Sequence, residues 1–317
     1  MTSHSRTPLL SVSLRSFSAE DPGGWDHLIE AAEVLDQVGF DRLVLSDHVV
    51  FGERLEEYGR PEVGGQAGGK QPTGPDGHWL EPLITLSVIA GRTRRVRLGT
   101  NILIAALRRP VVLAKMAATL DVLSGGRLDL GVGVGWQREE YEAAGLSFDS
   151  RGQALDETLR ICQLLWRNER AEYHSATTDF QAIHMMPKPV QPGGVPFWVS
   201  GTVNPRVVRR VAEFASGWIP WGDAAADVRK GIRQMRESLA AAGRDGSDLD
   251  VVGTLPARKG AQGIDVPATM EPVPELVEAG VTDLRTTVSI PRNRSEAEDV
   301  LAPFVAGFRA ATGRSSP

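Results

Sequence analysis

Residues 96–136 read VRLGTNILIAALRRPVVLAKMAATLDVLSGGRLDLGVGVGW and contain a strand, a helix and a second strand in succession. The apolar run Val96–Ile104 predicts the first strand, and Pro110–Leu123 predicts a helix with proline at its favoured first position. Ser124–Gly126 supplies the exit turn, and Leu128–Val134 predicts the next strand. Two strands joined by such a crossover helix run parallel in one sheet.

The same alternation continues along the chain. Further strands are predicted at Leu9–Leu14, Arg42–Ser46, Phe197–Ser200, Gly217–Pro220, Leu249–Leu255 and Thr282–Val288. Further helices are predicted at Trp25–Val38, Leu80–Ala90, Arg151–Trp166, Pro205–Phe214, Ala225–Ala242, Val273–Ala279 and Glu296–Ala311. About eight such units predict an α/β fold, a closed TIM-type (β/α)8 barrel. Leu14–Ser18 carries no G-x-G-x-x-G, which argues against an open dinucleotide-binding sheet.

Two stretches interrupt this alternation, and we predict that both are insertions in a single domain spanning residues 1–317. The first, residues 51–79, is rich in glycine and follows a strand, so in a barrel it lies on the catalytic face. It is either a lid over the site or a disordered insertion. The second, residues 171–191, contains Tyr173, Phe180 and Ile183 among polar residues and predicts a hairpin.

Composition restricts the class of protein. Hydrophobic residues make up 41% and charged residues 24%, as in globular proteins, and the formal net charge of -5 argues against binding nucleic acid. The N-terminus lacks an apolar signal core and no run is long enough for a membrane helix, so we expect a cytoplasmic protein. The single cysteine, Cys162, lies in a helical apolar pattern and is expected to be buried. The histidines show no ligand spacing, so no metal is expected.

Candidate catalytic residues follow the second predicted strand, because active sites of such barrels lie at the C-terminal ends of the strands. Histidine is the side chain suited to proton transfer near neutral pH, so His48 can donate or accept a proton at a reacting centre. Asp47 is adjacent to His48 but points elsewhere, so it need not be its partner. The alternative is a capping Asp47 and a loop His48 bonded to the backbone.

Three other strand ends carry candidate binding residues. Thr100 and Asn101 are polar residues within an apolar strand end. Gly131–Gly135 alternates glycine with valine, which allows a flat ring to approach closely. Ser200–Val203 precedes a helix and either binds an anion through free N–H groups or simply caps that helix. Of the two indoles at the next strand, Trp218 is expected in the core.

Three segments resemble the bacterial luciferase-like superfamily of flavin- and deazaflavin-dependent oxidoreductases. The first is Gly39–His48, GFDRLVLSDH. The second runs from Arg97 through Arg109-Pro110, Ala118–Asp121 and Gly131–Trp136 to Glu139-Glu140. The third comprises Leu155–Glu157, Leu164–Trp166 and Pro187–Gln191. Together they extend roughly from Leu9 to Trp221, whereas the C-terminal third matches only loosely.

The resemblance implies a cofactor, FMN or coenzyme F420, at the strand ends. It implies a cis peptide between Asn101 and Ile102 that backs the cofactor ring, with Asp47 and His48 beside the reacting part of that ring. It further implies that a wall near the cofactor is formed by Gly133, Val134 and Gly135. It also implies that the phosphate-bearing tail of the cofactor meets the turn formed by Ser200, Gly201, Thr202 and Val203.

Three positions depart from the family pattern. Trp136 stands where some deazaflavin dehydrogenases place a general-acid carboxylate, which puts a sugar-phosphate dehydrogenase role in doubt. Ser216 stands where relatives often have Asp, and Asn101 replaces a smaller residue of some relatives.

The resemblance implies three alternative functions. The first is an F420-dependent oxidoreductase that transfers hydride between the deazaflavin and a small organic substrate, with His48 delivering or taking a proton. The second is an FMN-dependent monooxygenase that uses O2 and reduced flavin from a separate reductase. The third is a barrel that only binds flavin, against which the intact Asp47-His48 and Asn101-Ile102 pairs argue. A homodimer is expected from the family. Arg258 and Arg285 either face the site and favour an anionic substrate or, more commonly for such residues, are solvated.

Overall fold

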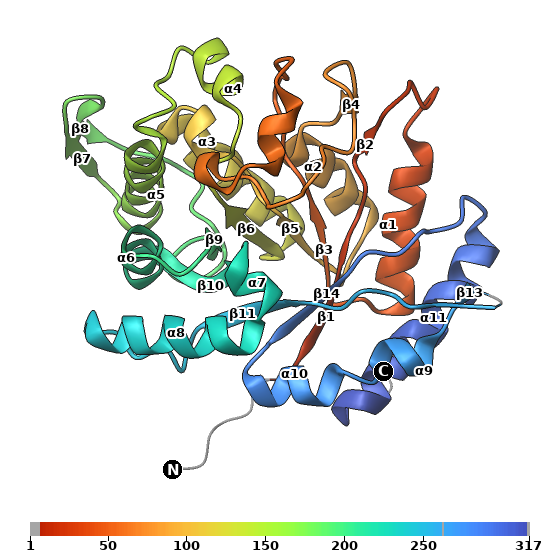
Figure 1. Ribbon diagram of the computed structural model, residues 1–317. Helices are drawn as coiled ribbons and strands as arrows, with labels where there is room; N and C mark the ends of the chain where they lie inside the picture. Colours follow the sequence, from red (N-terminus) through yellow and green to blue (C-terminus); the bar gives the residue numbers. More distant parts are fainter. Residues whose placement is uncertain (1–6, 262, 316–317) are drawn as a thin grey trace.

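A closed barrel of eight parallel strands forms the centre of the computed structural model, which describes residues 7–261 and 263–315 (Figure 1). The strand order around the barrel is β1-β14-β11-β10-β9-β6-β5-β3. The strands are β1 (Leu9–Ser13), β3 (Arg42–Leu45), β5 (Arg97–Thr100), β6 (Leu128–Val132), β9 (Phe197–Gly201), β10 (Ala215–Pro220), β11 (Asp250–Thr254) and β14 (Asp283–Thr286). This confirms the predicted TIM-type (β/α)8 fold.

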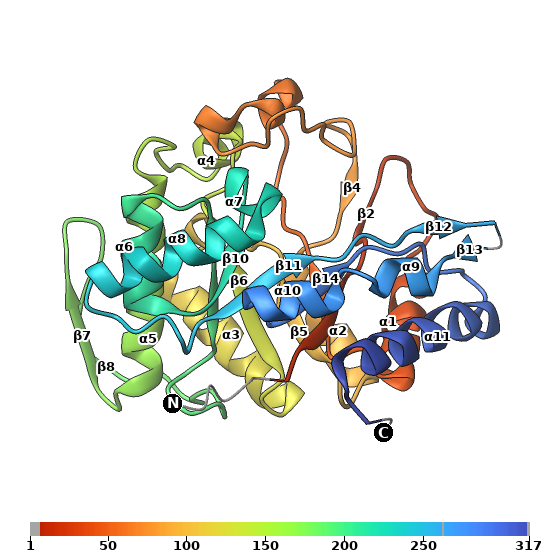
Figure 2. The same cartoon turned by 60° about the horizontal axis from the view of Figure 1, so that its bottom comes forward.

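Helices surround the barrel and cover its outer face (Figures 1 and 2). The longer ones are α1 (Asp26–Val38), α2 (Pro82–Arg92), α3 (Pro110–Ser124), α5 (Arg151–Arg167), α6 (Pro205–Phe214), α8 (Val228–Ala241), α10 (Val273–Ala279) and α11 (Arg294–Thr312). Short helices α4 (Arg138–Ala143), α7 (Asp223–Ala226) and α9 (Val266–Met270) complete the set. None of the helices in the described ranges is long and apolar enough to cross a membrane.

Two elements differ from the sequence prediction in ways that have a local reason. The strand expected at Val96–Ile104 ends at Thr100, because the chain then turns toward β6 and Leu103 donates its N–H to the Gly131 carbonyl. The helix expected at Ala225–Ala242 is two helices. Asp227 ends α7 and its side chain caps α8, accepting a hydrogen bond from the Lys230 N–H.

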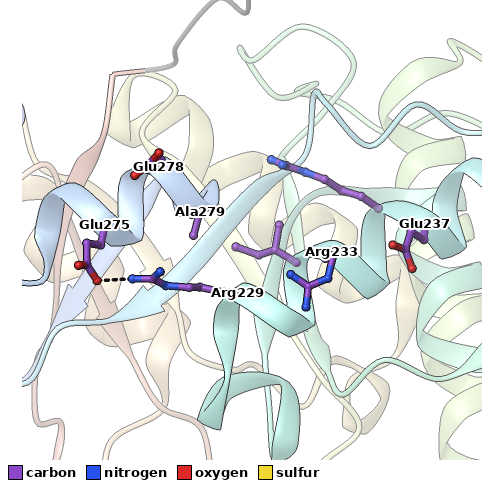
Figure 3. Close-up of a pocket in the computed structure, with 8 residues that line it drawn as sticks. Arg229, Arg233, Glu237, Glu275, Glu278 and Ala279 are labelled. Carbon is purple, nitrogen blue, oxygen red and sulfur yellow. Dashed lines mark hydrogen bonds and ion pairs between the residues drawn. The ribbon is translucent and has the colours of Figure 1, made fainter.

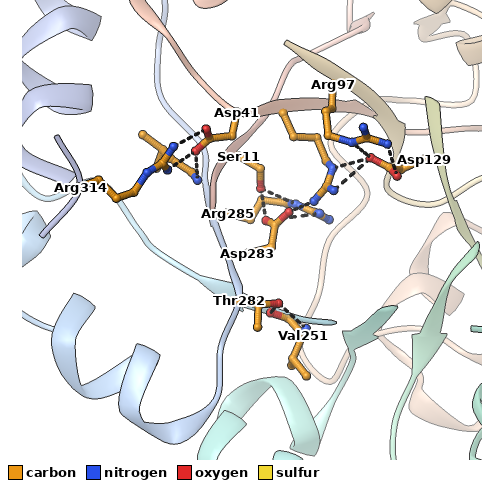
Figure 4. A network of polar contacts seen from close by, with 11 residues as sticks. Ser11, Asp41, Arg97, Asp129, Val251, Thr282, Asp283, Arg285 and Arg314 are labelled. Atoms are coloured by element: carbon orange, nitrogen blue, oxygen red, sulfur yellow. Dashed lines mark hydrogen bonds and ion pairs between the residues drawn. The ribbon is translucent and has the colours of Figure 1, made fainter. Parts of the chain in front are cut away.

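A network of ion pairs fills the inside of the barrel (Figure 4). The Arg42 guanidinium contacts the carboxylates of Asp129 and Asp283, and Arg97 donates two hydrogen bonds to Asp129 at 2.7 and 2.8 Å. Arg285, which is 7% exposed, donates to the Ser11 hydroxyl. The idea that Arg285 is solvated is therefore wrong, because its side chain points into the barrel. Arg258 is exposed and pairs with Glu271.

The first insertion, residues 51–79, forms a lid over the C-terminal ends of the strands (Figure 2). It contains η1 (Leu55–Gly59), η2 (Pro61–Val63) and β4 (His78–Trp79), and β4 pairs with β2 (Phe17–Ser18). Besides this pairing, three side-chain hydrogen bonds attach the lid to the rest of the domain: Arg54 to Glu139 at 2.6 Å, Arg151 to the Val63 carbonyl at 3.2 Å, and the Trp221 indole to the Gly65 carbonyl at 3.1 Å. These contacts favour the lid over the disordered alternative.

The second insertion is the predicted hairpin, formed by β7 (Ala171–His174) and β8 (Asp179–Ile183). A further hairpin, β12 (Lys259–Gly260) with β13 (Gly263–Ile264), was not predicted. Cys162 is fully buried in α5 as expected, and burial raises the pKa of its thiol.

Candidate active site

His48 lies just beyond β3 with its imidazole held by a buried carboxylate. Its Nδ1 is 3.2 Å from Glu140 Oε2, and Glu140 Oε1 accepts the Val49 N–H at 2.8 Å. The His48 side chain is 9% exposed and that of Glu140 is fully buried on α4. With the Glu140 carboxylate as acceptor, which also accepts the Val49 N–H, Nδ1 is the donor of this pair. Nε2 has no partner among the described residues, so it is the atom available for proton exchange.

Asp47 is directed away from His48. Its carboxylate accepts the Ile104 N–H at 2.9 Å and two bonds from the Arg108 guanidinium at 2.6 and 3.0 Å. Arg108 also pairs with Glu81. Burial alone would lower the pKa of Arg108, but its bonds and charge contacts with Asp47 and Glu81 outweigh burial and raise it. Both Asp47 oxygens are thus occupied, and the residue positions the segment that follows β5.

The Asn101–Ile102 peptide bond is cis, the isomer that the family resemblance implies. The Ile102 side chain packs beside Trp198, Ile219 and Val252 inside the barrel mouth. A Cβ at Gly133 would lie 2.9 Å from Ile102 Cδ1, and one at Gly135 would lie 3.1 Å from Ile104 Cδ1. The glycines therefore make room for two isoleucines. At Gly133 and Gly135, and at half-buried Val134 between them, the part of the chain that can contact a ligand is therefore the backbone.

The turn Ser200–Val203 leads into α6, whose cap is Asn204. Asn204 Oδ1 accepts the N–H groups of Arg206 and Val207 at 3.0 and 3.1 Å, which is the simple capping arrangement. The Gly201 carbonyl accepts the indole N–H of Trp218, which is fully buried as expected. Thr202 is exposed, and Ser200 and Val203 are partly exposed.

Five aromatic residues surround or adjoin His48, and we call them the aromatic cluster: Phe17, Phe51, Tyr58, Trp79 and Trp136. Ring centroids of Phe51, Trp79 and Trp136 lie 4.5, 4.8 and 5.9 Å from that of His48. Tyr58 contacts Trp136 at 5.5 Å, and Phe17 stacks on Trp79 at 4.1 Å. Three of the five come from the lid, so the lid closes over His48.

The sequence singled out Trp136 of the aromatic cluster through the family resemblance, but not Phe17, Phe51, Tyr58, Trp79 or Glu140 as site residues. Glu140 was visible only as part of the family resemblance, and it lies 92 positions from His48. No sequence motif with a fixed spacing connects a loop histidine to a helix carboxylate that lies so far along the chain. The lid aromatics also lie in a stretch without periodicity, so the sequence did not predict which of them face the site.

Buried polar atoms without a hydrogen-bond partner gather on the C-terminal side of the barrel. In the described ranges they lie at the ends of β1, β6 and β14, in the lid, and at the starts of α4 and α5. They are Ser16 Oγ, Gln71 Nε2, Trp136 Nε1, Gln137 Nε2 and Oε1, Glu139 Oε2, Arg151 Nε, Arg285 Nη1 and Thr286 Oγ1. Native proteins rarely leave such atoms unsatisfied, so this face fits a ligand with several polar groups.

A second surface feature lies apart from this face. A groove between α8 and α10 is lined by three arginines and three glutamates, with Arg229 paired to Glu275 (Figure 3). Its charges balance and no strand end contributes to it. Within residues 7–261 and 263–315, no group of three or more His, Cys, Asp or Glu side chains is arranged to hold a metal.

Known proteins resemble this chain in sequence over most of its length. Residues 9–258 match the family of luciferase-like monooxygenases. An uncharacterised protein of Mycobacterium tuberculosis is 32% identical over 205 residues, covering 65% of this chain and 68% of that one. An F420-dependent glucose-6-phosphate dehydrogenase of Microbacterium testaceum is 29% identical over 236 residues, covering 72% of this chain and 63% of that one.

Solved structures share the fold at low identity. An F420-dependent secondary alcohol dehydrogenase in complex with an F420-acetone adduct has a TM-score of 0.73 at 15% identity, covering 96% of this chain and 99% of that one. A long-chain alkane monooxygenase also has a TM-score of 0.73, at 14% identity, covering 100% and 93%. Because the family match spans all but the C-terminal part of the barrel, the chain belongs to the luciferase-like monooxygenase family and is an oxidoreductase of that family.

Proposed function

We propose that the protein is an F420-dependent oxidoreductase that transfers hydride between the deazaflavin and a small organic substrate. The observation that carries the proposal is His48, whose Nδ1 is held by Glu140 and whose Nε2 is left for proton exchange at the mouth of the barrel. The similarity to F420-dependent glucose-6-phosphate dehydrogenases supports the choice of cofactor.

The residues present fit such a cofactor. The unpartnered polar atoms of Trp136 and Gln137 can bind the polar groups of its ring system, and the Asn101–Ile102 segment can support the ring. The turn Ser200–Val203 at the start of α6 can receive its phosphate-bearing tail. When bound, F420 supplies a carbon that gives or takes a hydride.

The chain's own residues supply binding, orientation and proton transfer. His48 gives a proton to the substrate oxygen, or removes one, at Nε2. The Glu140 carboxylate fixes the orientation of the His48 ring through its contact with Nδ1. Asp47 and Arg108 hold the segment after β5 in place, and the lid excludes water from the site.

The second candidate is an FMN-dependent monooxygenase that receives reduced flavin from a separate reductase and uses O2. The structural likeness to the alkane monooxygenase favours it as an alternative. Its cofactor would occupy the same strand ends and supply oxygen activation. His48 and the lid would then shield the site and control protons.

Titration of the purified protein with oxidised F420 and, separately, with FMN tests the cofactor assignment. Binding is followed by the change in cofactor fluorescence. We expect the dissociation constant of F420 to be at least about tenfold below that of FMN, which is a difference of roughly 1.4 kcal/mol in binding free energy. Tight FMN binding without F420 binding would refute the proposal and favour the monooxygenase.

His48→Ala tests the proton-transfer role. We expect it to bind F420 with an unchanged dissociation constant and to turn over at least about 100-fold more slowly, the usual contribution of a general acid or base. Turnover is measured with a substrate found by screening alcohols against F420 and carbonyl compounds against reduced F420. Unchanged turnover in His48→Ala would instead support a barrel that only binds its cofactor.

A further inference from the structure

Arg285 is the arginine of the barrel's ion-pair network that lies nearest the C-terminal ends of the strands. It is the third residue of β14, whereas Arg42, Arg97 and Asp283 are the first residues of their strands. Two residues of extended chain span roughly 7 Å, so Arg285 begins that much farther toward the catalytic face than Asp283. Figure 4 shows its side chain beside Ser11 and Asp283, inside the barrel.

One nitrogen of the Arg285 guanidinium has no partner. Its Nε donates to the Ser11 hydroxyl at 3.1 Å, and its Nη2 lies 3.7 Å from the Asp283 carboxylate. The buried Nη1 has no hydrogen-bond partner among the described residues. Burial lowers the pKa of Arg285, but the ordinary value of an arginine is so high that the side chain keeps its charge. Arg285 is therefore a buried cation with one side unused.

A small cavity joins Arg285 to the proposed support of the cofactor ring. The cavity measures about 10 Å³, and Thr100 and Gly131 line it together with Arg285. Thr100 directly precedes the Asn101–Ile102 peptide. A space of this size has room for about one water molecule. Arg285 thus reaches the level of Thr100, one residue below the ring support.

The β6 side of the barrel shows how far this level lies below the proposed cofactor wall. A Cβ at Gly131 would lie 3.0 Å from Ile219 Cδ1, and one at Gly133 would lie 2.9 Å from Ile102 Cδ1. The two isoleucines pack in one cluster, so both glycines face the interior. Their separation along the chain is roughly 7 Å. The charge of Arg285 therefore lies a short way below the wall, and the apolar side chains between them screen it poorly.

Hydride transfer changes the charge at this wall. In the proposed reaction an alcohol C–H bond breaks and its hydride joins the ring, while the hydroxyl proton passes to His48 Nε2 and a carbonyl forms. The hydride carries two electrons and one proton, so the ring gains one negative charge. The ionisable groups at the barrel mouth are already paired, His48 with Glu140 and Asp47 with Arg108. The unused side of Arg285 is thus the charge left to answer that gain.

We propose that Arg285 stabilises the reduced, more negatively charged form of the cofactor ring from below, without touching it. The proposal rests on the proposed function. It gives a buried residue of the barrel interior an electrostatic role in setting how strongly the bound cofactor holds its hydride. A flavin ring gains the same charge when it takes up a hydride, so the role does not depend on which of the two cofactors binds.

The test compares how tightly the protein binds the oxidised and the reduced cofactor. Dissociation constants of oxidised and reduced F420 are measured by equilibrium dialysis without oxygen, at pH 8, where few protons are available to neutralise the added charge. The variants are Arg285→Gln, which removes the charge, and Arg285→Lys, which keeps it. Arg314→Gln is the matched control, because Arg314 pairs with Asp41 just before β3, at the opposite end of the barrel.

We expect the dissociation constant of reduced F420, divided by that of oxidised F420, to rise about tenfold in Arg285→Gln, which lowers the two-electron potential of the bound cofactor by about 30 mV. Arg285→Lys and Arg314→Gln should change this ratio less than twofold. A purely structural loss weakens both forms equally and leaves the ratio unchanged. An unchanged ratio in Arg285→Gln, or an equal rise in Arg285→Lys, would overturn the proposal.

Two further outcomes keep the test decisive. If Arg285→Gln does not fold, Asp283→Asn takes its place. It removes the negative charge beside Arg285 and should lower the ratio, so a rise or no change would overturn the proposal. If F420 does not bind, the proposed function fails and the same ratio is measured with FMN, whereas a protein that binds neither overturns both. An unchanged ratio in a protein that binds F420 overturns only the role of Arg285.

Discussion

At the scale of single residues, the site depends on two polar side chains that are adjacent in the sequence but bind different partners. Asp47 pairs with Arg108 and so supports the backbone, whereas His48 pairs with Glu140 and keeps one nitrogen unpaired. The two residues are adjacent in sequence, but their side chains lead to different neighbours. Chemistry is therefore expected to depend on His48 directly and on Glu140 through its hold on His48.

Replacing Glu140 tests this positioning role. Glu140→Ala removes two hydrogen bonds from a carboxylate, to His48 Nδ1 and to the Val49 N–H. We expect kcat to fall about tenfold to 100-fold with little change in KM, since charged hydrogen bonds contribute roughly 1.5–3 kcal/mol. Steady-state kinetics measure both constants.

Two further variants separate this role from general destabilisation. Glu140→Gln keeps an oxygen acceptor and should recover part of the lost kcat. Glu142→Gln makes the same change on an exposed position of α4 and should leave kinetics unchanged. If Glu140→Ala changed KM and kcat together with a large drop in melting temperature, a purely structural role would be the better account.

At the scale of elements, the lid is the most informative segment. It contributes three of the five residues in the aromatic cluster and is tied to α4, α5 and the end of β10. Gly64 in the lid has a φ of 101°, and a Cβ there would lie 3.1 Å from the Gly135 carbonyl oxygen. The lid and the β6 loop thus meet backbone to backbone at this point.

A pair of glycine variants tests whether this contact holds the lid down. Gly64→Ala and Gly68→Ala both place a side chain at positive φ, but only Gly64 faces a neighbour. We expect limited proteolysis within residues 51–79 to be at least about fivefold faster in Gly64→Ala than in Gly68→Ala, the effect of roughly 1 kcal/mol of lost docking. Equal rates would show that docking does not depend on this contact.

At the scale of the whole molecule, stability depends on ion pairs that lie away from the site. The barrel interior carries the ion-pair network of Arg42, Arg97, Asp129, Asp283 and Arg285. Burial alone would raise the pKa of Asp129, but the charge of Arg42 and the hydrogen bonds from Arg97 outweigh burial and hold it below its ordinary value. This makes folding sensitive to acid.

The sign of that effect follows from linkage. Because the pKa of Asp129 is lower in the folded protein than in the unfolded chain, the stabilisation is complete above the ordinary value of about 3.9 and is lost as pH falls through the folded value. We expect the free energy of unfolding, measured in urea, to be constant in this respect above about pH 5 and to fall as the pH is lowered from about 5 toward about 2. Asp129→Asn should cost roughly 3–5 kcal/mol at pH 7 and reduce this slope.

The exposed Asp299→Asn serves as the control and should change neither stability nor slope. A slope that is the same in Asp129→Asn and in the wild type would assign the acid sensitivity to other carboxylates.

Assembly is predicted from the outer face of two adjacent helices. Ile84 and Val88 on α2 are 64% and 52% exposed, and Val112 and Leu123 on α3 are 53% and 70% exposed. Such apolar exposure on a folded protein is typical of an interface, and we propose that a second copy of the chain covers it. We expect the wild type to sediment as a dimer and Leu123→Lys as a monomer.

The control for assembly is Ala240→Lys, on the exposed side of α8, which should remain dimeric. A wild type that sediments as a monomer at micromolar concentration would contradict the proposal.

The sequence by itself determined the barrel. Apolar runs alternate with amphipathic helices, and glycines such as Gly39 and Gly125, both left-handed at helix ends, stop those helices where predicted. These signals are local, because they depend on periodicity and backbone preference over a few residues. His48 and Asn101 could be singled out for the same reason, since each lies near a strand end that the pattern places on one face, whereas the cis peptide between Asn101 and Ile102 was implied only by the family resemblance.

Only the tertiary structure decided which partner each side chain meets. The pairing of His48 with Glu140, the turn of Asp47 toward Arg108, the inward direction of Arg285 and the approach of the lid aromatics all join residues far apart in the chain. Such contacts depend on barrel closure, which brings eight strand ends to one face, and no spacing within a single segment encodes them. The nature of the site was therefore visible in the sequence, whereas its working geometry was set by the closed barrel.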